Sequence, residues 1–174
     1  MTAQLQIRDE PLTKAHRLSA FACGDDALDR HLRRHARALS SLNRSRTIVA
    51  VEPERPGDPV AFATLMPGAV DVSAADQNRL DRYWQTEVPA VHVSHFAVSR
   101  TVQQLGIGTA LLLAVGLRVL PLAAEGKALV LVVHAPPGPW PTSLCRHFGA
   151  VAFADAPDRL VIPLATLAGA AASL

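Results

Sequence analysis

The chain has 174 residues, of which 49% are hydrophobic and 18% are charged, and its formal net charge is +2. This length and this apolar content favour one folded domain over residues 1–174, and they argue against a second domain. The small net charge says little about binding partners, whereas the distribution of the charge along the chain is informative.

Targeting, membrane and redox features are absent from the sequence. Residues 1–10 are polar, which argues against a signal peptide, and the richest apolar run, Thr109–Ala124, is interrupted by an arginine and a proline. We therefore expect a cytoplasmic protein with no membrane span. Cys23 and Cys145 lie far apart without metal-ligand spacing, so we expect reduced thiols and no metal site.

The N-terminal part of the chain predicts a strand followed by a helix. The strand begins in Leu5–Arg8, and the helix covers about Ala27–Leu39. Gly24-Asp25-Asp26 provides capping residues immediately before this helix. We expect Leu28 and Leu32 to face the core while the arginines of the helix stay in solvent.

A hairpin, a short helix and a third strand are predicted next. The hairpin strands are Thr47–Val51 and Val60–Leu65, and the prolines and glycine of residues 53–59 are expected to continue neither strand. A short helix is predicted over Ala74–Tyr83. After a turn at Val88-Pro89, the apolar run Val91–Val98 predicts another strand.

The C-terminal part predicts a long helix, two strands and a short helix. The helix covers Thr109–Leu120, and Ala128–Val133 is continuously apolar, as expected of a strand that is covered on both faces. A short helix near Thr142–His147 and a strand near Arg159–Pro163 precede the Ala-rich tail Ala165–Leu174. This order predicts an α+β domain with a mixed central sheet flanked by helices.

A glycine-containing loop, Gln103–Gly108, lies between the predicted strand Val91–Val98 and the long helix. Gly106 and Gly108 permit backbone angles that turn successive N–H groups into one concavity, and the helix start adds positive potential. The motif lacks the Gly-Lys-Ser/Thr ending of Walker A and the third glycine of the dinucleotide fingerprint. It predicts a phosphate site, with an ordinary strand-to-helix turn as the alternative.

One segment between Asp29 and Glu52 is basic and contains no acidic residue. Such a segment attracts polyanions by counterion release, and a solvated helix face is the plainer interpretation. The candidate residues for binding a phosphate-rich partner are Arg30, Arg33, Arg34, Arg37, Arg44 and Arg46.

The motif Q-x-x-G-x-G resembles the acetyl-coenzyme A pyrophosphate loop of the GNAT (acyl-CoA N-acyltransferase) fold. Phe21-Ala22-Cys23-Gly24, followed by Leu28-Asp29 and Leu32, resembles the opening of GNAT toxins from bacterial toxin–antitoxin modules. Phe96-Ala97-Val98, Leu131–Ala135 and His147-Phe148-Gly149 extend the resemblance over most of the chain. It implies the GNAT fold and transfer of an acetyl group from acetyl-CoA to a primary amine.

The resemblance also implies which residues bind acetyl-CoA. The backbone of Phe96, Ala97 and Val98 would pair with the pantetheine arm, and the amides of the loop would hold the pyrophosphate. The cofactor-binding residues implied are Phe96, Ala97, Val98, Gln103, Gln104, Leu105, Gly106, Ile107, Gly108 and Thr109.

The catalytic positions depart from the family pattern. Cys145 stands where most members have a tyrosine that protonates the departing thiolate, and it is either the acid or a small buried residue. A water or Ser143 is the alternative proton donor. His92, on the strand before the loop, is the candidate base, and His95 is expected on the opposite face of that strand.

Three functions are compatible with these features. The first is a toxin-like acetyltransferase that modifies the amine of aminoacyl-tRNA and blocks translation, with a ribbon-helix-helix antitoxin as partner and a homodimer as the assembly. The second is a GNAT enzyme that acts on a small-molecule or protein amine. The third is a degenerate domain that binds coenzyme A or a protein without catalysis, which the cysteine favours.

Overall fold

The computed structural model describes residues 6–76, 80, 86–134, 143 and 147–172. Within them, the strands are β1 (Arg8–Pro11), β2 (Arg46–Glu52), β3 (Arg55–Asp71), β4 (Glu87–Val98), β5 (Val130–His134), β6 (Val151–Ala152) and β7 (Arg159–Pro163). They form a seven-stranded sheet in the order β1-β2-β3-β4-β5-β7-β6. β4 and β5 pair in parallel, whereas β1 with β2, β2 with β3, and β7 with β5 and β6 pair antiparallel. The predicted mixed sheet is confirmed.

Helices accompany this sheet, as expected for an α+β fold. They are α1 (Asp26–Arg30), a π-helical segment (His31–His35), α2 (Ala36–Ser41), a 3-10 turn (Arg100–Val102), α3 (Ile107–Ala124) and α5 (Leu164–Ala172). The chain divides into two compact units. The first unit comprises Met1–Met66 and Ser94–Val115, and the second comprises Pro67–Val93 and Gly116–Leu174.

The helical region α1–α2 begins and ends where the sequence provides caps. The Asp25 carboxylate accepts hydrogen bonds from the N–H groups of Ala27 at 2.8 Å and Leu28 at 3.3 Å, which satisfies free donors of the first turn. At the other end, Asn43 has a φ of 56°, a left-handed conformation that asparagine tolerates and that stops the helix. The predicted helix Ala27–Leu39 is therefore confirmed, with a π-helical segment in its middle.

The β2–β3 hairpin contains more strand than predicted. β3 begins at Arg55, so the proline- and glycine-containing segment that we expected to stay outside the strands is largely part of one. The pairing register shifts between Ala50 and Val51 and again between Val51 and Glu52, with Val51 opposite Pro59. Bulges of this kind let a strand contain prolines while the hydrogen-bonded pairing with the neighbouring strand continues before and after them.

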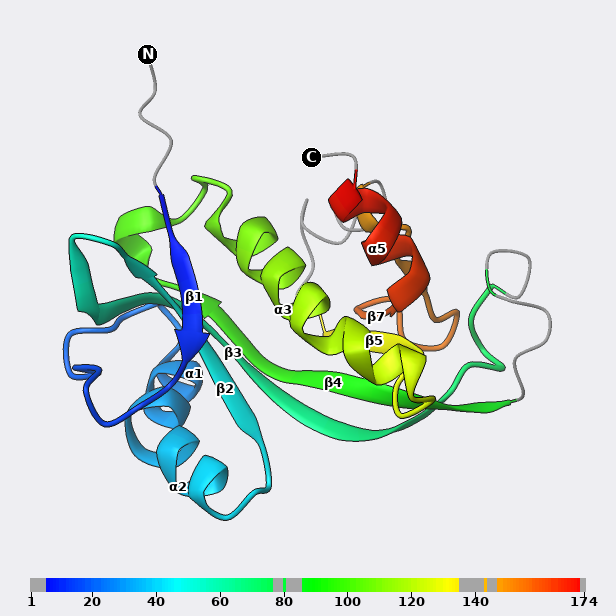
Figure 1. Cartoon of the computed structure of the whole chain (residues 1–174), viewed down its shortest axis with the longest axis horizontal. Helices are drawn as coiled ribbons and strands as arrows, with labels where there is room; N and C mark the ends of the chain where they lie inside the picture. Colours follow the sequence, from blue (N-terminus) through cyan, green and yellow to red (C-terminus); the bar gives the residue numbers. More distant parts are fainter. Residues whose placement is uncertain (1–5, 77–79, 81–85, 135–142, 144–146, 173–174) are drawn as a thin grey trace. The chain divides into compact units, whose positions relative to one another are not determined.

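The core of the first unit lies between its helical region and its strands. Leu32, Val49 and Phe62 are fully buried there, and Phe21 packs edge-on against Phe62 with ring centroids 5.5 Å apart. In Figure 1, α1 and α2 lie beside β2. Burial of such large apolar side chains stabilises each by about 1.5–3 kcal/mol, so this packing holds the helical region against the sheet.

The second unit has its own core. Val88 and Ala90 of β4, Val130 and Val132 of β5, and Phe153 are buried together. α5 follows β7 directly and packs against it (Figure 1). The described part of the Ala-rich tail forms this helix, which covers Leu164–Ala172.

α3 is longer than the predicted Thr109–Leu120 and continues through Pro121. By length and composition alone it is apolar enough to cross a membrane, with a mean hydropathy of 2.0 over an 18-residue window, contrary to our expectation. Its buried hydrophobic residues are Ile107, Leu111, Leu112, Val115 and Val119. This spacing is typical of a helix that buries one stripe in a protein core.

Other boundaries also needed correction. β1 lies at Arg8–Pro11, later than the predicted start in Leu5–Arg8, and β6 was not predicted at all. Most of the helix predicted over Ala74–Tyr83 lies outside the described residues, and residues 74–76 at its start contain an isolated bridge from Ala75 to Phe153. The turn expected at Val88-Pro89 lies inside β4, and most of the short helix predicted near Thr142–His147 lies outside the described residues.

Candidate functional site

The glycine loop connects β4 to the N-terminus of α3, as predicted. Gln104 and Gly106 have left-handed φ values of 64° and 80°. A Cβ on Gly106 would meet nothing within 4 Å, so this position borders open space and needs glycine for its backbone angle. The Ala110 N–H donates to the Gly106 carbonyl at 3.0 Å as the helix begins. The N–H groups of residues 107–109 precede that bond and lie at the positive end of α3.

The side chain of Gln103 holds this loop in position. Its Nε2 donates to the carbonyl of Val98 at 2.9 Å and to that of Cys23 at 2.7 Å. A Cβ on Gly108 would lie 3.5 Å from Phe96 and from Val98, so the start of α3 lies against the end of β4. Gln103 therefore fixes the loop with its side-chain amide instead of offering that amide to a ligand.

These features fit the pyrophosphate of acetyl-CoA. Open space at Gly106, backbone donors at residues 107–109 and a helix start are what a phosphate group requires. The end of β4 supplies Phe96, Ala97 and Val98 beside the same helix start. All these residues belong to the first unit.

Two arginines of the basic segment are held by the protein itself. Arg33 donates to the carbonyl of Phe21, and Arg37 donates to the carbonyls of Thr13 and His16. We expected the arginines of the helix to stay in solvent; Arg33 is exposed as predicted, whereas Arg37 is half-buried. Their position on the helical region brings them against the preceding loop, whose carbonyls need donors.

The remaining arginines are more exposed. Arg46 donates to the carbonyl of Ser40 at 3.0 Å and to the side chain of Asn43 at 2.9 Å, so it closes the end of the helical region. Within the described part of the chain, three exposed arginines of the segment have side chains without a hydrogen bond or ion pair: Arg30, Arg34 and Arg44. These three are the arginines available to a polyanion.

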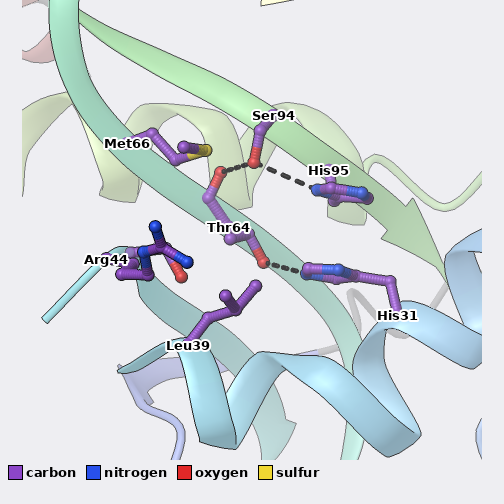
Figure 2. Close-up of a pocket in the computed structure, with 8 residues that line it drawn as sticks. His31, Leu39, Arg44, Thr64, Met66, Ser94 and His95 are labelled. Atoms are coloured by element: carbon purple, nitrogen blue, oxygen red, sulfur yellow. Dashed lines mark hydrogen bonds between the residues drawn. The ribbon is translucent and has the colours of Figure 1, made fainter. Parts of the chain in front are cut away.

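A cavity of about 340 Å³ lies beside the helical region in the first unit (Figure 2). His31 and His95 line it together as a pair of stacked rings in contact, with centroids 3.5 Å apart and planes 3° apart (Figure 2). His31 Nε2 lies 3.0 Å from the Thr64 hydroxyl, and His95 Nδ1 lies 3.0 Å from the Ser94 hydroxyl. Sequence reasoning placed His95 only on a strand face, because stacking between residues so far apart leaves no local pattern.

The rest of the cavity wall is partly apolar. Leu39 and Met66 line it together with Arg44, and the Met66 side chain is 42% exposed (Figure 2). Ser45 also lines the cavity, and its hydroxyl is buried without a hydrogen-bond partner among the described residues. The cavity thus combines apolar walls with a few polar groups, which is the usual composition of a small-molecule site.

The two histidines are neutral near pH 7. Burial, followed by the nearby His95 and His35, lowers the pKa of His31 to about 4. Burial also lowers the pKa of His95. A neutral imidazole is able to accept a proton, which gives this cavity chemical as well as binding potential.

Of the two predicted catalytic residues, the structure describes only His92. His92 belongs to the second unit, where its Nε2 lies 2.9 Å from the carbonyl of Ala69, so in the neutral ring Nε2 carries the proton. Cys145 lies outside the described residues. Within the described part of the chain, no group of three His, Cys, Asp or Glu side chains is placed to hold a metal ion.

No family model matches the chain. Solved structures of similar fold include AtaT complexed with acetyl-methionyl-tRNAfMet, with a TM-score of 0.81 and 18% identity over 94% of this chain and 98% of that chain. A tyrosine-to-phenylalanine mutant of KacT gives the same TM-score, identity and coverage. A structure described as a bacterial toxin has a TM-score of 0.81 and 14% identity over 97% of both chains.

AtaT and KacT are GNAT toxins of toxin–antitoxin modules. The resemblance inferred from the sequence motifs is therefore confirmed at the level of the fold. At 14–18% identity, the similarity extends to the backbone fold, whereas the chemistry depends on the residues of this chain.

Proposed function

We propose that this chain is an acetyl-CoA-dependent N-acetyltransferase of the toxin type, which acetylates the primary amine of aminoacyl-tRNA and so blocks translation. The observation that carries the proposal is the glycine loop at the start of α3, with open space at Gly106 and backbone donors at residues 107–109, in a chain with the fold of AtaT. That AtaT structure contains acetyl-methionyl-tRNAfMet, an acetylated aminoacyl-tRNA.

Acetyl-CoA is the co-substrate in this proposal. AtaTR has been solved bound with acetyl-CoA, which supports the same role for the loop here. The N–H groups of residues 107–109 bind the pyrophosphate, and the backbone of Phe96–Val98 pairs with the pantetheine arm. His92 is one candidate for the base, through Nδ1, and Cys145 is the candidate that returns a proton to the thiolate.

The tRNA contacts come from the arginines that the protein leaves free. Arg30, Arg34 and Arg44 are exposed and without partners in the described structure, so their charge is available to phosphates. Arg33 and Arg37 support this surface indirectly by holding the loop before α1.

Protein partners form part of the same proposal. AtaT has been solved bound to the C-terminus of the antitoxin AtaR, and KacTA in a complex with DNA. These relatives support an antitoxin partner for this chain, and we propose one of the ribbon-helix-helix type. We also propose that the chain acts as a homodimer in the cytoplasm, with no metal ion.

The decisive experiment is incubation of the purified protein with isotopically labelled acetyl-CoA and a charged total tRNA pool, followed by mass spectrometry of the aminoacyl groups. The same tRNA after deacylation is the control. Label on the amino acid supports the proposal. If a small amine is added to the same incubation and it alone carries label, the result would favour an enzyme that acts on small-molecule or protein amines. Coenzyme A binding without any transfer would favour a binding domain.

A charge reversal tests the contribution of the free arginines. Arg34→Glu should weaken acetylation of tRNA about fivefold at low salt and reduce its salt dependence, without affecting small amines. Arg55→Glu is the matched control, because Arg55 is exposed at the start of β3, outside the basic segment. Equal losses in both variants would argue against a specific role for Arg34.

A further inference from the structure

The cavity beside the helical region has an unsatisfied polar group in its wall. The Ser45 hydroxyl is buried, with 3% of the residue exposed, and it has no hydrogen-bond partner within the described structure. Leaving a buried hydroxyl unpaired costs free energy, and such groups are normally satisfied by a ligand or an ordered water. Because Ser45 lines the cavity, this hydroxyl indicates that the cavity holds a polar group when it is in use.

The hydrogen bonds around His95 fix which of its nitrogens is free. The Ser94 hydroxyl donates to the Thr64 carbonyl at 3.2 Å, because a carbonyl oxygen can only accept. The Ser94 oxygen therefore accepts from His95 Nδ1, which lies 3.0 Å away and carries the ring proton. The neutral imidazole then has its lone pair on Nε2, so His95 is set up to accept a proton at that atom (Figure 2).

The wall selects against charged groups inside the cavity. Among the described lining residues none is acidic, and the two facing imidazoles are neutral. Leu39 and Met66 provide apolar surface, and Arg44 is a cation that repels a second cation. A positively charged side chain would lose its hydration here and would find no negative charge on these walls. A negatively charged side chain would find only Arg44.

We propose that this cavity is the acceptor pocket, that it takes a primary amine attached to an uncharged side chain of medium size, and that His95 Nε2 receives the amine proton. This inference rests on the proposed acetyl transfer and names the acceptor within it. The Ser45 hydroxyl accepts a hydrogen bond from the amine, and Leu39 and Met66 contact the side chain. Arg44 lies where the phosphate of a nucleotide ester would be.

The transfer step is balanced in atoms and electrons. His95 Nε2 takes one proton from the ammonium group as it enters the cavity, so the amine is held there in its neutral form. The neutral nitrogen then forms a bond to the acetyl carbonyl carbon while the carbon–sulfur bond breaks. The electron pair of that bond leaves with the sulfur of coenzyme A, which takes a proton from its acid, and the second amine proton restores that acid. His95 returns its proton to solvent, and the products are an N-acetylated amine and free coenzyme A.

Binding tests the pocket separately from the chemistry. Leucinamide and lysinamide are titrated into the full-length protein while the imidazole C–H resonances are followed by NMR. Leucinamide should shift the resonances of His31 and His95, and lysinamide at the same concentration should leave them in place. Unmoved resonances with leucinamide, or equal shifts with both amides, would overturn the pocket assignment.

Kinetics with charged tRNA test the role of His95. His95→Phe keeps a flat ring against His31 but removes Nε2, so kcat should fall about a hundredfold. The Kd for coenzyme A and the melting temperature should stay unchanged. His35→Gln, an exposed histidine of the same helical region, is the control. His92→Phe tests the rival base, and a larger loss there than in His95→Phe would overturn the assignment.

Leu39→Trp supplies a second variant that does not alter the proton acceptor. By filling the cavity it should raise KM about tenfold for large apolar aminoacyl groups and spare glycyl and alanyl groups. An unchanged amino acid profile would contradict the pocket. If the wild-type protein labels no aminoacyl-tRNA while leucinamide still binds at His95, then the tRNA function fails and the amine pocket stands.

Discussion

Replacement of His31 by glutamine should flatten the pH dependence of the stability of the fold. His31 is 6% exposed, and burial lowers its pKa from 6.5 to about 4. As pH falls, the unfolded chain takes up this proton first, near 6.5, so the free energy of unfolding decreases until the folded pKa is reached. Above neutral pH the effect disappears.

The size of the effect follows from the two pKa values. One pKa unit corresponds to about 1.4 kcal/mol, so the interval from 6.5 to about 4 amounts to about 3 kcal/mol in full. Between pH 7 and pH 5 the expected loss is about 2 kcal/mol. The groups near His31 that carry or can take positive charge are His35 on its own segment, His95 on β4, and Arg44 at the cavity.

The assay is urea unfolding at pH 7 and pH 5 for the wild type and His31→Gln. Glutamine retains an amide near the Thr64 hydroxyl but does not titrate, so the variant should lose about 2 kcal/mol less than the wild type over this interval. His134→Gln, at the exposed end of β5, should behave like the wild type. Parallel losses in wild type and His31→Gln would refute the reasoning that His31 is neutral because it is buried.

Three further substitutions test the fold and the loop. Asp25→Ala removes the cap of α1 and should lower the free energy of unfolding by about 1 kcal/mol in urea titration, with Asp26→Ala as an exposed control. Gly106→Ala should lower the free energy of unfolding by about 1–2 kcal/mol, because alanine disfavours the φ of 80° at this position, and it should weaken coenzyme A binding in calorimetry. A stable variant with full affinity would contradict the proposed pyrophosphate binding by the glycine loop. Gly116→Ala should lower the melting temperature, because its Cβ would lie 2.7 Å from the Leu167 side chain, and co-substitution Leu167→Ala should relieve part of that loss.

Local patterns predicted most of the secondary structure. β7 was predicted at Arg159–Pro163, where it lies, and β2 and the helical region were predicted within a few residues of their ends. These elements have strong apolar periodicity or clear caps, so short-range chemistry decides them. The glycine loop was also placed correctly, because its neighbours on both sides are regular elements.

The missed elements depend on partners distant in the sequence. The strand through Pro56, Gly57 and Pro59 exists because the partner strand bulges opposite it, and propensity alone argues against it. β6 is a two-residue strand that forms only by pairing with β7. Neither feature leaves a detectable period in the local sequence.

The candidate site was predictable only in part. The loop could be read from its glycines, whereas the pairing of His31 with His95 needs the helical region and β4 to meet. The basic segment identified a real concentration of charge, but not which of its guanidinium groups, such as those of Arg33 and Arg37, the protein uses for itself. Whether an arginine bonds to the protein or stays free depends on the direction in which its side chain leaves the helix axis. The π-helical segment makes these directions differ from those of a regular helix.

The π-helical segment at His31–His35 makes the helical region sensitive to length. A π turn accommodates an additional residue within an α-helix, so deleting one residue there would restore regular winding. The residues on the N-terminal side of the deletion would then rotate by about 100° relative to those on its C-terminal side. His31 would leave its place against His95, and Asp25 would begin the helix in a different direction. The alignment of the two imidazoles therefore depends on the residue count of this turn as well as on its residue types.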